Sequence, residues 1–475
     1  MTDKSSLLSP AGVEDPTSLK YMLRLAAPMI VTTLSFTIMQ FVDRLMVSRL
    51  GTDALAAILP AGFVSFLPSG FAMGAMASLN TFVSQSLGRG DRKACSSYYW
   101  QVIWMGTAYF LVALAVMWPT APWIFRFMGQ PEGIIDMEVI YLRIMLYAHV
   151  LAVVNWSGNQ FFMGIHRPVI TMIASLCGQV VNVIANYLLI FGKFGFPRME
   201  IAGAGWGTFI GITVAGAVNM AAFLSGGMNR DFGSRRSLRV NFGKMCSLLK
   251  VGLPAGFGLM LDVAFWGMIL FWLVGRHGTE VLAATSAVLS YGSLAVMPVV
   301  GIGTALSAAV GKAIGEGRKD LVAKQTSVCL RIGLAYMGLV GLCFLVFRSG
   351  LMRFWSDDPR VIEGGVNILV CAAFYQVFQA VRTIYAGALR GAGDTLWLGV
   401  VSSIGAAFIL GLGGWLVTEL LPWTGYMGPW TAAAVSIAAV GLANGWRFKS
   451  NRWMKIDLFK RPPLAVPVQD GTVVE

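Results

Sequence analysis

The segment RLGTDALAA at residues 49–57 returns as RHGTEVLAA at residues 276–284, which is 227 positions later. Two more pairs of segments keep the same offset, namely LGRG from Leu87 with IGEG from Ile314, and RFMGQPEGI from Arg126 with RFWSDDPRV from Arg353. Three matches at one offset are hard to obtain by chance, and self-similarity at a fixed period is the signature of an internal repeat. The chain is therefore predicted to consist of two homologous halves.

Composition places the chain in a lipid bilayer. Of the 475 residues, 56% are hydrophobic and only 12% are charged, against about 25% charged residues in an average soluble domain. Apolar runs long enough to cross the ~30 Å hydrocarbon layer, which takes about 20 helical residues, recur along the whole chain. We count twelve, which begin near Ala26, Ile58, Tyr99, Glu138, Val169, Ala202, Leu248, Leu282, Ser327, Gly364, Leu396 and Tyr426.

These runs predict an all-α integral membrane protein with twelve transmembrane helices, six in each half. They do not show the alternating apolar and polar residues of transmembrane β-strands. Because six is an even number, both halves have the same orientation and are related by an axis along the membrane normal. Two such six-helix bundles are expected to enclose a central cleft in which a substrate binds.

The expected boundaries follow from the apolar runs. An N-terminal tail (1–24) precedes the N-lobe (25–228), and an inter-lobe loop (229–247) leads to the C-lobe (248–446) and a C-terminal tail (447–475). The first residues lack the apolar core and the small-residue cleavage site of a secretory signal. The N-terminal tail is therefore expected to stay in the cytoplasm, and an even number of spans puts the C-terminal tail on the same side.

Lys and Arg residues gather in one set of loops, and this distribution predicts the orientation. The loops are GRGDRK (88–93), GIHRP (164–168), NRDFGSRRSLRVNFGK (229–244), GEGRKD (315–320) and LRGAGD (389–394). Basic residues in short loops concentrate on the cytoplasmic side of a membrane protein. We therefore expect a multi-pass protein of the cytoplasmic (inner) membrane. The net charge of +13 reflects this topology, and no nucleic-acid-binding motif accompanies it.

Motifs of several other protein classes are missing. The six cysteines form no CxxC pair and the three histidines are far apart, so neither a zinc site nor a disulfide framework is indicated. No GxxxxGKS or GxxxxGKT segment provides an ATP-binding loop. We expect no enzyme and no cofactor. The expected partners are small molecules and membrane lipid, the protein itself being a monomer.

Asp43 is the most unusual residue of the first span, because it lies well inside an apolar run that starts near Leu25. A charged side chain near the middle of a bilayer costs about 2.5–3.5 kcal/mol on insertion scales. A carboxyl group in such a place can take up and release a proton or hold a monovalent cation such as Na⁺. The alternative is a structural pairing with Arg44 or Gln40, although adjacent residues point in different directions around a helix.

Further motifs occur in a fixed order along both halves. They are LAAP (25–28) and VGLP (251–254) at the start of the two first spans, the GT..LAA turns, SQSLGRGD (84–91), NVIANYLLIFGKFGFP (182–197), GAGWGT (203–208) and GALRGAGDT (387–395). With these motifs, the chain from about residue 25 to residue 449 resembles the multidrug and toxic compound extrusion (MATE) transporters of the NorM-like bacterial type. The resemblance implies an antiporter that exports amphipathic organic cations in exchange for protons or sodium as its two lobes rock.

The resemblance also gives Asp43 a role, since sodium- and proton-coupled members carry a coupling Asp at this distance from the first-span proline, here Pro28. Asn182 and Asn186 share one face of the fifth span and can complete a cation or proton site with Asp43, with Thr208 in reach from the sixth span. The alternative is ordinary hydrogen bonding between helices, worth about 0.6 kcal/mol per pair. Related members can carry Asp at the position of Asn186, so the amide makes this site less acidic.

Asp262 is the candidate of the second half, eight residues after Pro254, where NorM-type members usually carry an acidic residue. Those members also have an Asp in the tenth span, where this chain has Gln379. That departure argues against a C-lobe sodium site built on two carboxylates. Arg382 is instead expected to pair with Asp262. Pro28 and Pro254 are the expected hinges, because a proline inside a helix removes a backbone hydrogen bond.

An organic cation in the cleft needs aromatic faces as well as carboxylates. The candidate cleft residues are Phe36, Gln40, Phe66, Trp156, Trp266, Tyr291 and Tyr375. We predict proton coupling through Asp43, because a proton needs one carboxylate whereas dehydrated Na⁺ needs several oxygens and a full negative charge. The alternative function is a flippase for a lipid-linked glycan or another amphiphile within the same superfamily, for which Arg44 and Arg382 are the candidate cationic groups.

Overall fold

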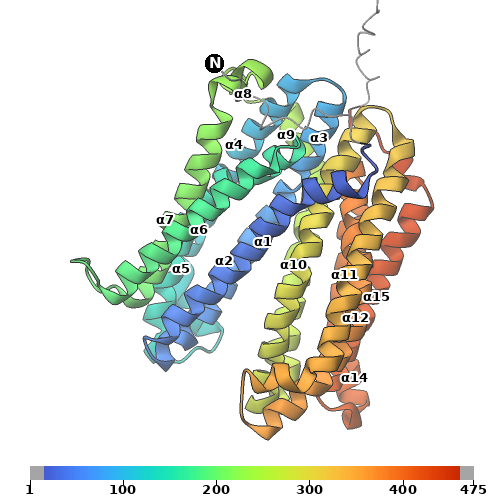
Figure 1. Cartoon of the computed structure of the whole chain (residues 1–475). Helices are drawn as coiled ribbons and strands as arrows, with labels where there is room; N and C mark the ends of the chain where they lie inside the picture. The colour runs from blue at the N-terminus through green and yellow to red at the C-terminus, as the bar shows by residue number, and fades with distance from the viewer. Residues whose placement is uncertain (1–14, 460–475) are drawn as a thin grey trace, which may run out of the picture.

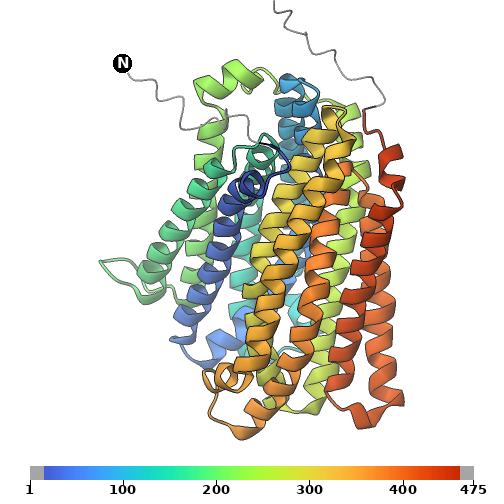
Figure 2. The same cartoon turned by 45° about the vertical axis from the view of Figure 1, so that its right-hand side comes forward.

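The structure is a computed structural model, and it describes residues 15–459. Within these residues all regular structure is helical. Figure 1 shows the long helices running side by side in two groups, and Figure 2 shows the C-terminal group from another side. The all-helical prediction is confirmed for the described residues.

The N-lobe contains the first six spans. They are α1 (Leu19–Ser48), α2 (Thr52–Met76) continued by α3 (Ser78–Gly88), α4 (Arg92–Phe127), α5 (Glu132–Gly164), α6 (Pro168–Phe191) and α7 (Glu200–Phe223). Helix α1 begins within the segment expected to be a tail, because the Ser18 side chain accepts a hydrogen bond from the backbone N–H of Tyr21 and caps the helix. Residues 1–14 of the expected tail lie outside the described part of the chain.

The C-lobe follows the short helix α8 (Gly226–Phe232). Its spans are α9 (Phe242–Met268) with a π-helical turn at Ile269–Val274, α10 (Thr279–Gly315), α11 (Lys319–Arg353), α12 (Pro359–Ala392), α13 (Thr395–Ile404) joined through a π-helical segment at Gly405–Gly413 to α14 (Gly414–Leu420), and α15 (Met427–Lys449). The last sixteen residues of the expected C-terminal tail, 460–475, are not among the described residues.

Eleven helical segments of the described chain are long and apolar enough to cross a membrane. The twelfth span of the prediction corresponds to α15, a helix of 23 residues that is not among these eleven segments. It packs against α12 inside the C-lobe. Six spans therefore belong to each lobe, as the repeat predicts.

The repeat is visible in the backbone. Gly51 and Gly278 precede α2 and α10 with φ angles of 120° and 109°, and Gly90 and Gly317 follow α3 and α10 with φ angles of 79° and 78°. These are left-handed conformations that glycine adopts without strain. Each pair is separated by the repeat offset of 227, so the two halves use the same turns at the same positions.

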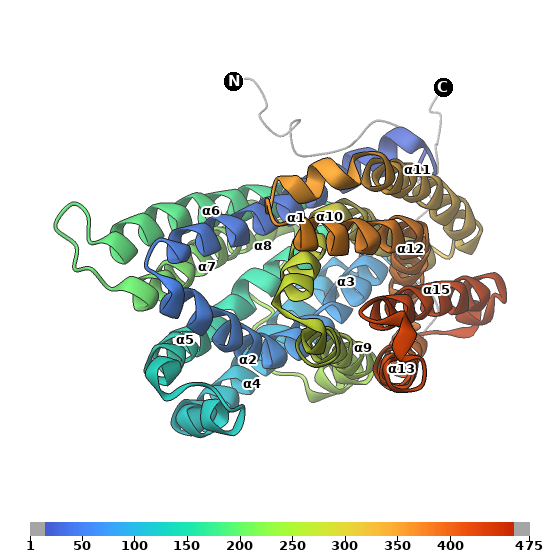
Figure 3. The ribbon, with the colours of Figure 1, turned by 90° about the horizontal axis from the view of Figure 1, so that it is seen from below.

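The two lobes meet along two equivalent pairs of helices, α2 with α9 and α1 with α10. Figure 3 shows these four helices between the outer helices of the two lobes. A Cβ atom on Gly74 of α2 would lie 2.7 Å from the carbonyl oxygen of Ala255, and one on the repeat-equivalent Gly301 of α10 would lie 2.9 Å from the backbone nitrogen of Ile30. Small residues let helix backbones approach each other closely within a membrane.

The lobes also contact each other closely at the end that carries the basic loops, called here the basic face. A Cβ atom on Gly88 would lie 3.0 Å from the Cα of Gly315, and a Cβ on Gly315 would lie 3.0 Å from the Cα of Gly88. These two glycines are also repeat equivalents. Nearby, Thr81 donates a hydrogen bond to the carbonyl of Arg390 at 2.8 Å and Gln85 donates one to that of Gly391 at 2.9 Å. The basic face is thus closed.

Toward the opposite end, the two groups of helices diverge (Figure 1). Among the described residues, the last hydrogen bond from α1 to the C-lobe is donated by Thr33 to the carbonyl of Met297 on α10, at 3.1 Å. Thr33 lies five residues after Pro28, which is buried inside α1. The part of α1 that carries Asp43 therefore extends beyond the region where the lobes are bonded to each other.

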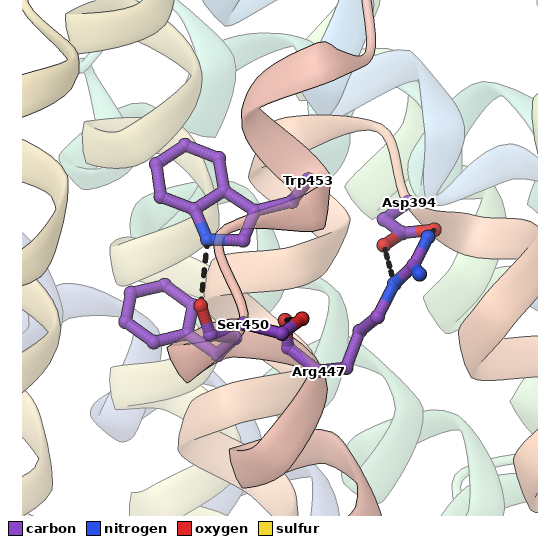
Figure 4. Close-up of polar contacts among 5 residues, drawn as sticks. Asp394, Arg447, Ser450 and Trp453 are labelled. Carbon is purple, nitrogen blue, oxygen red and sulfur yellow. Dashed lines mark hydrogen bonds and ion pairs between the residues drawn. The ribbon is translucent and has the colours of Figure 1, made fainter.

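A buried ion pair fixes the C-terminal end of α15. Arg447 Nε lies 2.7 Å from Asp394 Oδ2 in the turn between α12 and α13, and the Asp394 side chain is only 4% exposed (Figure 4). Trp453 Nε1 donates to the carbonyl of Phe448 at 3.0 Å, and the two rings stack with centroids 5.5 Å apart. These contacts hold the start of the C-terminal tail against the C-lobe.

The glycine contact at the basic face leads to a first prediction. Gly315→Leu places a side chain where Gly88 and the Gln85 carbonyl already lie, and overpacking of this kind costs about 1–3 kcal/mol. The variant is expected to insert normally but to separate the lobes at the basic face. The measurement is thiol modification of Ser84→Cys in a chain whose native cysteines have been replaced, since Ser84 is fully buried in this contact.

The matched control is Gly338→Leu on α11, where a Cβ atom meets nothing within 4 Å. Modification of the Ser84→Cys thiol should rise in Gly315→Leu and stay unchanged in Gly338→Leu. Equal protection in both variants would show that the Gly88 and Gly315 contact does not close this face.

Candidate functional site

The structure places Asp43 against α6. The Asn186 amide nitrogen donates a hydrogen bond to Asp43 Oδ1 at 2.7 Å. Arg44, the next residue, is exposed, because adjacent residues on a helix point about 100° apart. Within residues 15–459 no basic side chain forms an ion pair with Asp43, so the expected alternative of a pair with Arg44 is not what the structure contains. Gln40 is exposed on the same helix.

A chain of hydrogen bonds continues from Asp43 into the N-lobe. The Asn186 amide nitrogen also lies 3.4 Å from Asn182 Oδ1, and the Asn182 amide nitrogen lies 3.4 Å from Thr208 Oγ1. Thr208 in turn donates to the backbone carbonyl of Ala204 at 3.0 Å. The four residues named from the sequence are thus brought together, on three different helices, α1, α6 and α7.

Glycines on α7 make room for this arrangement. A Cβ atom on Gly207 would collide with Asn186 Oδ1, and one on Gly211 would lie 2.6 Å from the Cβ of Asn182. Helices α6 and α7 therefore approach closely at the two asparagines, which are almost fully buried. Asn186 Oδ1 has no hydrogen-bond partner within the described chain. Gly207 of the GAGWGT segment and Gly211 one turn later thus make room for the Asn186 and Asn182 side chains.

Two buried polar residues of α5 were not predicted from the sequence as members of a site. The buried Tyr141 lies close enough to Asp43 to interact with it electrostatically. Glu138, one helical turn before it, is 0% exposed, and neither of its carboxylate oxygens has a hydrogen-bond partner among the described residues. The available signal was a carboxylate at the border of an apolar run, which we interpreted only as the start of the fourth span.

In the C-lobe the structure contains the expected ion pair. Arg382 on α12 donates from Nη2 to Asp262 Oδ1 on α9 at 3.0 Å, and the two side chains are 18% and 23% exposed. Gln379, one turn earlier on α12, has a buried Oε1 atom without a partner in the part of the chain that the structure describes. Asp262 is therefore paired with one cationic group, and Pro254 lies two turns before it inside α9.

The aromatic cleft candidates do not gather in one place. Trp156 packs on Phe110 and His149 in the N-lobe core, with ring centroids 5.9 and 6.0 Å away. Phe36 and Phe66 are 45% and 38% exposed. Of the N-lobe candidates, Trp156 therefore packs within the core of its own lobe, whereas Phe36 and Phe66 have exposed side chains.

The C-lobe candidates are more strongly engaged within their lobe. The Tyr291 hydroxyl donates to the carbonyl of Leu351 at 2.9 Å. Tyr375 is 7% exposed and belongs to the hydrophobic core, and Trp266 lies edge-on to Trp430 with centroids 6.3 Å apart. Whether any of these residues meets a substrate stays a prediction.

Comparison with known proteins connects this arrangement to a family. The MatE family model matches the chain twice, over residues 28–188 and 254–413. A probable multidrug resistance protein NorM of Chromobacterium violaceum is 31% identical over 432 residues, which cover 88% of this chain and 90% of that protein. The multidrug resistance protein PmpM of Pseudomonas aeruginosa is 26% identical, with 91% of each chain covered.

Solved structures share the fold. A variant of the MATE transporter VcmN of Vibrio cholerae matches with a TM-score of 0.83 at 18% identity, covering 93% of this chain and 99% of that one. A multidrug resistance MATE family transporter of the MOP superfamily in its outward-facing conformation also matches with a TM-score of 0.83 at 18% identity, over 93% and 98% of the two chains. Each match of the family model lies within one lobe and starts at its first-span proline, Pro28 or Pro254. The chain belongs to the MatE family of membrane-spanning transporters, and it is not an enzyme.

Proposed function

We propose that this transporter is a secondary antiporter that exports amphipathic organic cations in exchange for protons, with Asp43 as the proton-binding group. The observation that carries the proposal is the hydrogen bond from the Asn186 amide nitrogen to the Asp43 carboxylate. The names of the relatives, which are multidrug resistance proteins, support drugs as the exported compounds.

The orientation of the amides favours a proton over sodium. A sodium ion in this group would need oxygen atoms directed at it, together with the charge of Asp43. Asn186 instead directs its nitrogen at the carboxylate, and Asn182 directs its nitrogen at Thr208. The Asn186 amide thus supports the ionised carboxylate as a hydrogen-bond donor and offers no oxygen in that contact. A proton needs only the carboxyl group itself, so Na⁺ coupling is the alternative that the geometry favours less.

Exchange follows from the charge of Asp43. The ionised carboxylate attracts an organic cation, and aromatic faces add cation–π attraction. When Asp43 takes up a proton from outside, it becomes neutral and loses this attraction. The Asn182 and Asn186 group then serves as its hydrogen-bonding partner and the drug is released outward. Proton release to the cytoplasm restores the charge and the affinity for the next drug molecule.

Alternating access requires the lobes to separate at the basic face, which the Gly88 and Gly315 contact closes. A rocking motion about the α1–α10 and α2–α9 contacts would open it. Pro28 and Pro254 lie inside α1 and α9, the helices that make these contacts, and so are placed to act as hinges. We propose that the described state faces outward and that rocking of the two lobes gives the inward-facing state.

We place the protein in the bacterial inner membrane, where it works as a monomer without a cofactor. The basic loops support a cytoplasmic position of the basic face, following the positive-inside rule. The start of α1 and the end of α15 lie at that same end of the molecule (Figures 1 and 2). Both termini are therefore proposed to be cytoplasmic.

A flippase for lipid-linked glycans or other amphiphiles is the alternative function. Such a protein would use interior cationic groups to bind an anionic head group. Arg382, one of the two candidates, is paired with Asp262 at 3.0 Å, which leaves little charge for an anionic substrate. The antiporter proposal therefore has the better support.

Asp43→Asn tests the coupling. The variant keeps the size of the side chain but cannot ionise, so drug-induced proton movement is expected to fall to about the level of empty vesicles. The measurement is efflux of a fluorescent organic cation from proteoliposomes under a pH gradient in sodium-free buffer, with proton flux followed in parallel. Asp136→Asn, which changes an exposed carboxylate on α5, is the matched control and should transport normally.

Sodium dependence decides between the two ions. The native protein should export the cation in sodium-free buffer when only a pH gradient is imposed. If the sodium-free vesicles show no efflux and added sodium restores it, the proton assignment is wrong and sodium is the coupling ion.

The Asp262 and Arg382 pair leads to a stability prediction. Arg382→Ala leaves a mostly buried carboxylate without its partner, which is expected to destabilise the protein by up to about 3 kcal/mol. Adding Asp262→Asn removes the unpaired charge and should recover part of the loss. Thermal unfolding of the purified variants measures both effects.

Equal unfolding temperatures for the native protein and both variants would contradict a stabilising pair. A stable double variant that no longer transports would instead assign Arg382 to an anionic substrate.

A further inference from the structure

The segment that joins the two lobes, residues 234–241 between α8 and α9, is held tightly against α4. We call it the linker. Trp100 Nε1 donates to the carbonyl of Ser234 at 2.8 Å, and Trp104 Nε1 donates to that of Leu238 at 3.2 Å. Gln101 forms two bonds to the linker: its Nε2 donates to the carbonyl of Arg239 at 3.1 Å, and its Oε1 accepts from the backbone nitrogen of Asn241 at 2.8 Å. Side chains of one helix thus satisfy the backbone of a segment that has no regular structure.

A cavity of about 440 Å³ opens between the linker and the starts of α4 and α9. Its lining includes three cationic side chains, Lys93 from α4, Arg239 from the linker and Lys244 from α9. Ser97, Ser237 and Asn241 add hydrogen-bonding groups, Ala94 and Val240 are the apolar members, and Asp91 is the one acidic member. These cationic residues therefore come from three separate segments and line one cavity.

Asp91 does not neutralise the cavity. Its Oδ1 atom accepts a hydrogen bond from the backbone N–H of Ala94 at 3.0 Å and caps α4. One capping carboxylate stands against three cationic groups, so an excess of positive charge remains. A small anion with several acceptor oxygens, such as a phosphate group, is the ligand that this combination of cations and hydroxyl donors fits.

The surroundings of the cavity are those of a membrane surface. Leu238, Val240 and Phe242 follow one another at every second position and are 43%, 53% and 77% exposed. Trp104, whose indole nitrogen is bonded to the linker, is 40% exposed. Apolar side chains next to an exposed Trp are typical of the interface between the hydrocarbon layer and the head groups. These side chains suit a position of the cavity at the level of the lipid phosphates.

We propose that this cavity binds the phosphate of an anionic phospholipid, with Lys93, Arg239 and Lys244 around the head group and the acyl chains beside Leu238, Val240 and Phe242. The basic face is where anionic lipids of the cytoplasmic leaflet are attracted, at about 1 kcal/mol for each Lys or Arg near the surface. A lipid in this place contacts α4 of the N-lobe, α9 of the C-lobe and the linker at once. The lipid therefore holds the linker, which connects the two lobes covalently, against one helix of each lobe.

The test measures lipid binding to the purified full-length protein by native mass spectrometry after removal of endogenous lipid. Phosphatidylglycerol is compared with zwitterionic phosphatidylcholine. In the variant Arg239→Gln/Lys244→Gln, binding of phosphatidylglycerol should weaken by about fivefold for each charge removed, with binding of phosphatidylcholine unchanged. Thermal unfolding in detergent shows whether the variant is folded.

The matched control is Arg236→Gln/Lys250→Gln. It removes two exposed charges from the same linker and the same helix outside the cavity, and it should bind phosphatidylglycerol as the native protein does. Unchanged binding in the cavity variant, or an equal loss in the control, overturns the proposal.

A competition with millimolar inorganic phosphate distinguishes binding of a lipid phosphate from binding of free phosphate. Lipid that stays bound supports the proposal, whereas complete displacement assigns the cavity to free phosphate and overturns it.

Discussion

The close approach of helix backbones between the two lobes is the constraint on which the rest of the structure depends. Within a bilayer, helices gain nothing from leaving the apolar solvent, so packing and hydrogen bonds hold them together. The glycines at the lobe contacts, Gly74 and Gly301 beside the core helices and Gly88 and Gly315 at the basic face, bring backbone against backbone. Hydroxyl and amide groups such as Thr81 and Gln85 then bond directly to carbonyls of the other lobe. The Asp43 group lies where these contacts have ended.

Much of this architecture could be predicted because it depends on length, hydropathy and repetition. The offset of 227 residues predicts which glycines are equivalent, and equivalent residues meet where the lobes are related by symmetry. The grouping of Asp43 with Asn182, Asn186 and Thr208 could also be proposed, because a four-residue spacing puts both asparagines on one helix face. Asp262 and Arg382 could be paired by charge, since ionisable residues inside a membrane often pair with one another.

The rest depends on three-dimensional details that spacing does not determine. Which atom of the Asn186 amide faces Asp43 follows from the positions of three helices and from the missing side chain of Gly207. The aromatic candidates share a residue type but not a location, so Trp156 and Tyr375 belong to the cores of different lobes. The linker could not be predicted either, because its bonds come from tryptophan and glutamine side chains of α4 to backbone carbonyls. A sequence shows those side chains but not the backbone groups they meet.

The symmetry of the basic-face contact has a consequence for the history of the chain. In a symmetric dimer of identical half-length subunits, a residue on the twofold axis meets its own copy, so any substitution alters both sides at once. Gly88 and Gly315 still have that relation. Ser84 and Gly311 are equivalent positions too, yet a Cβ atom on Gly311 would collide with Ser84 Oγ. Two serines would not fit there, and two glycines would lack the hydroxyl. Joining the halves into one polypeptide allowed the two copies to diverge into a complementary pair that no dimer of identical subunits can form.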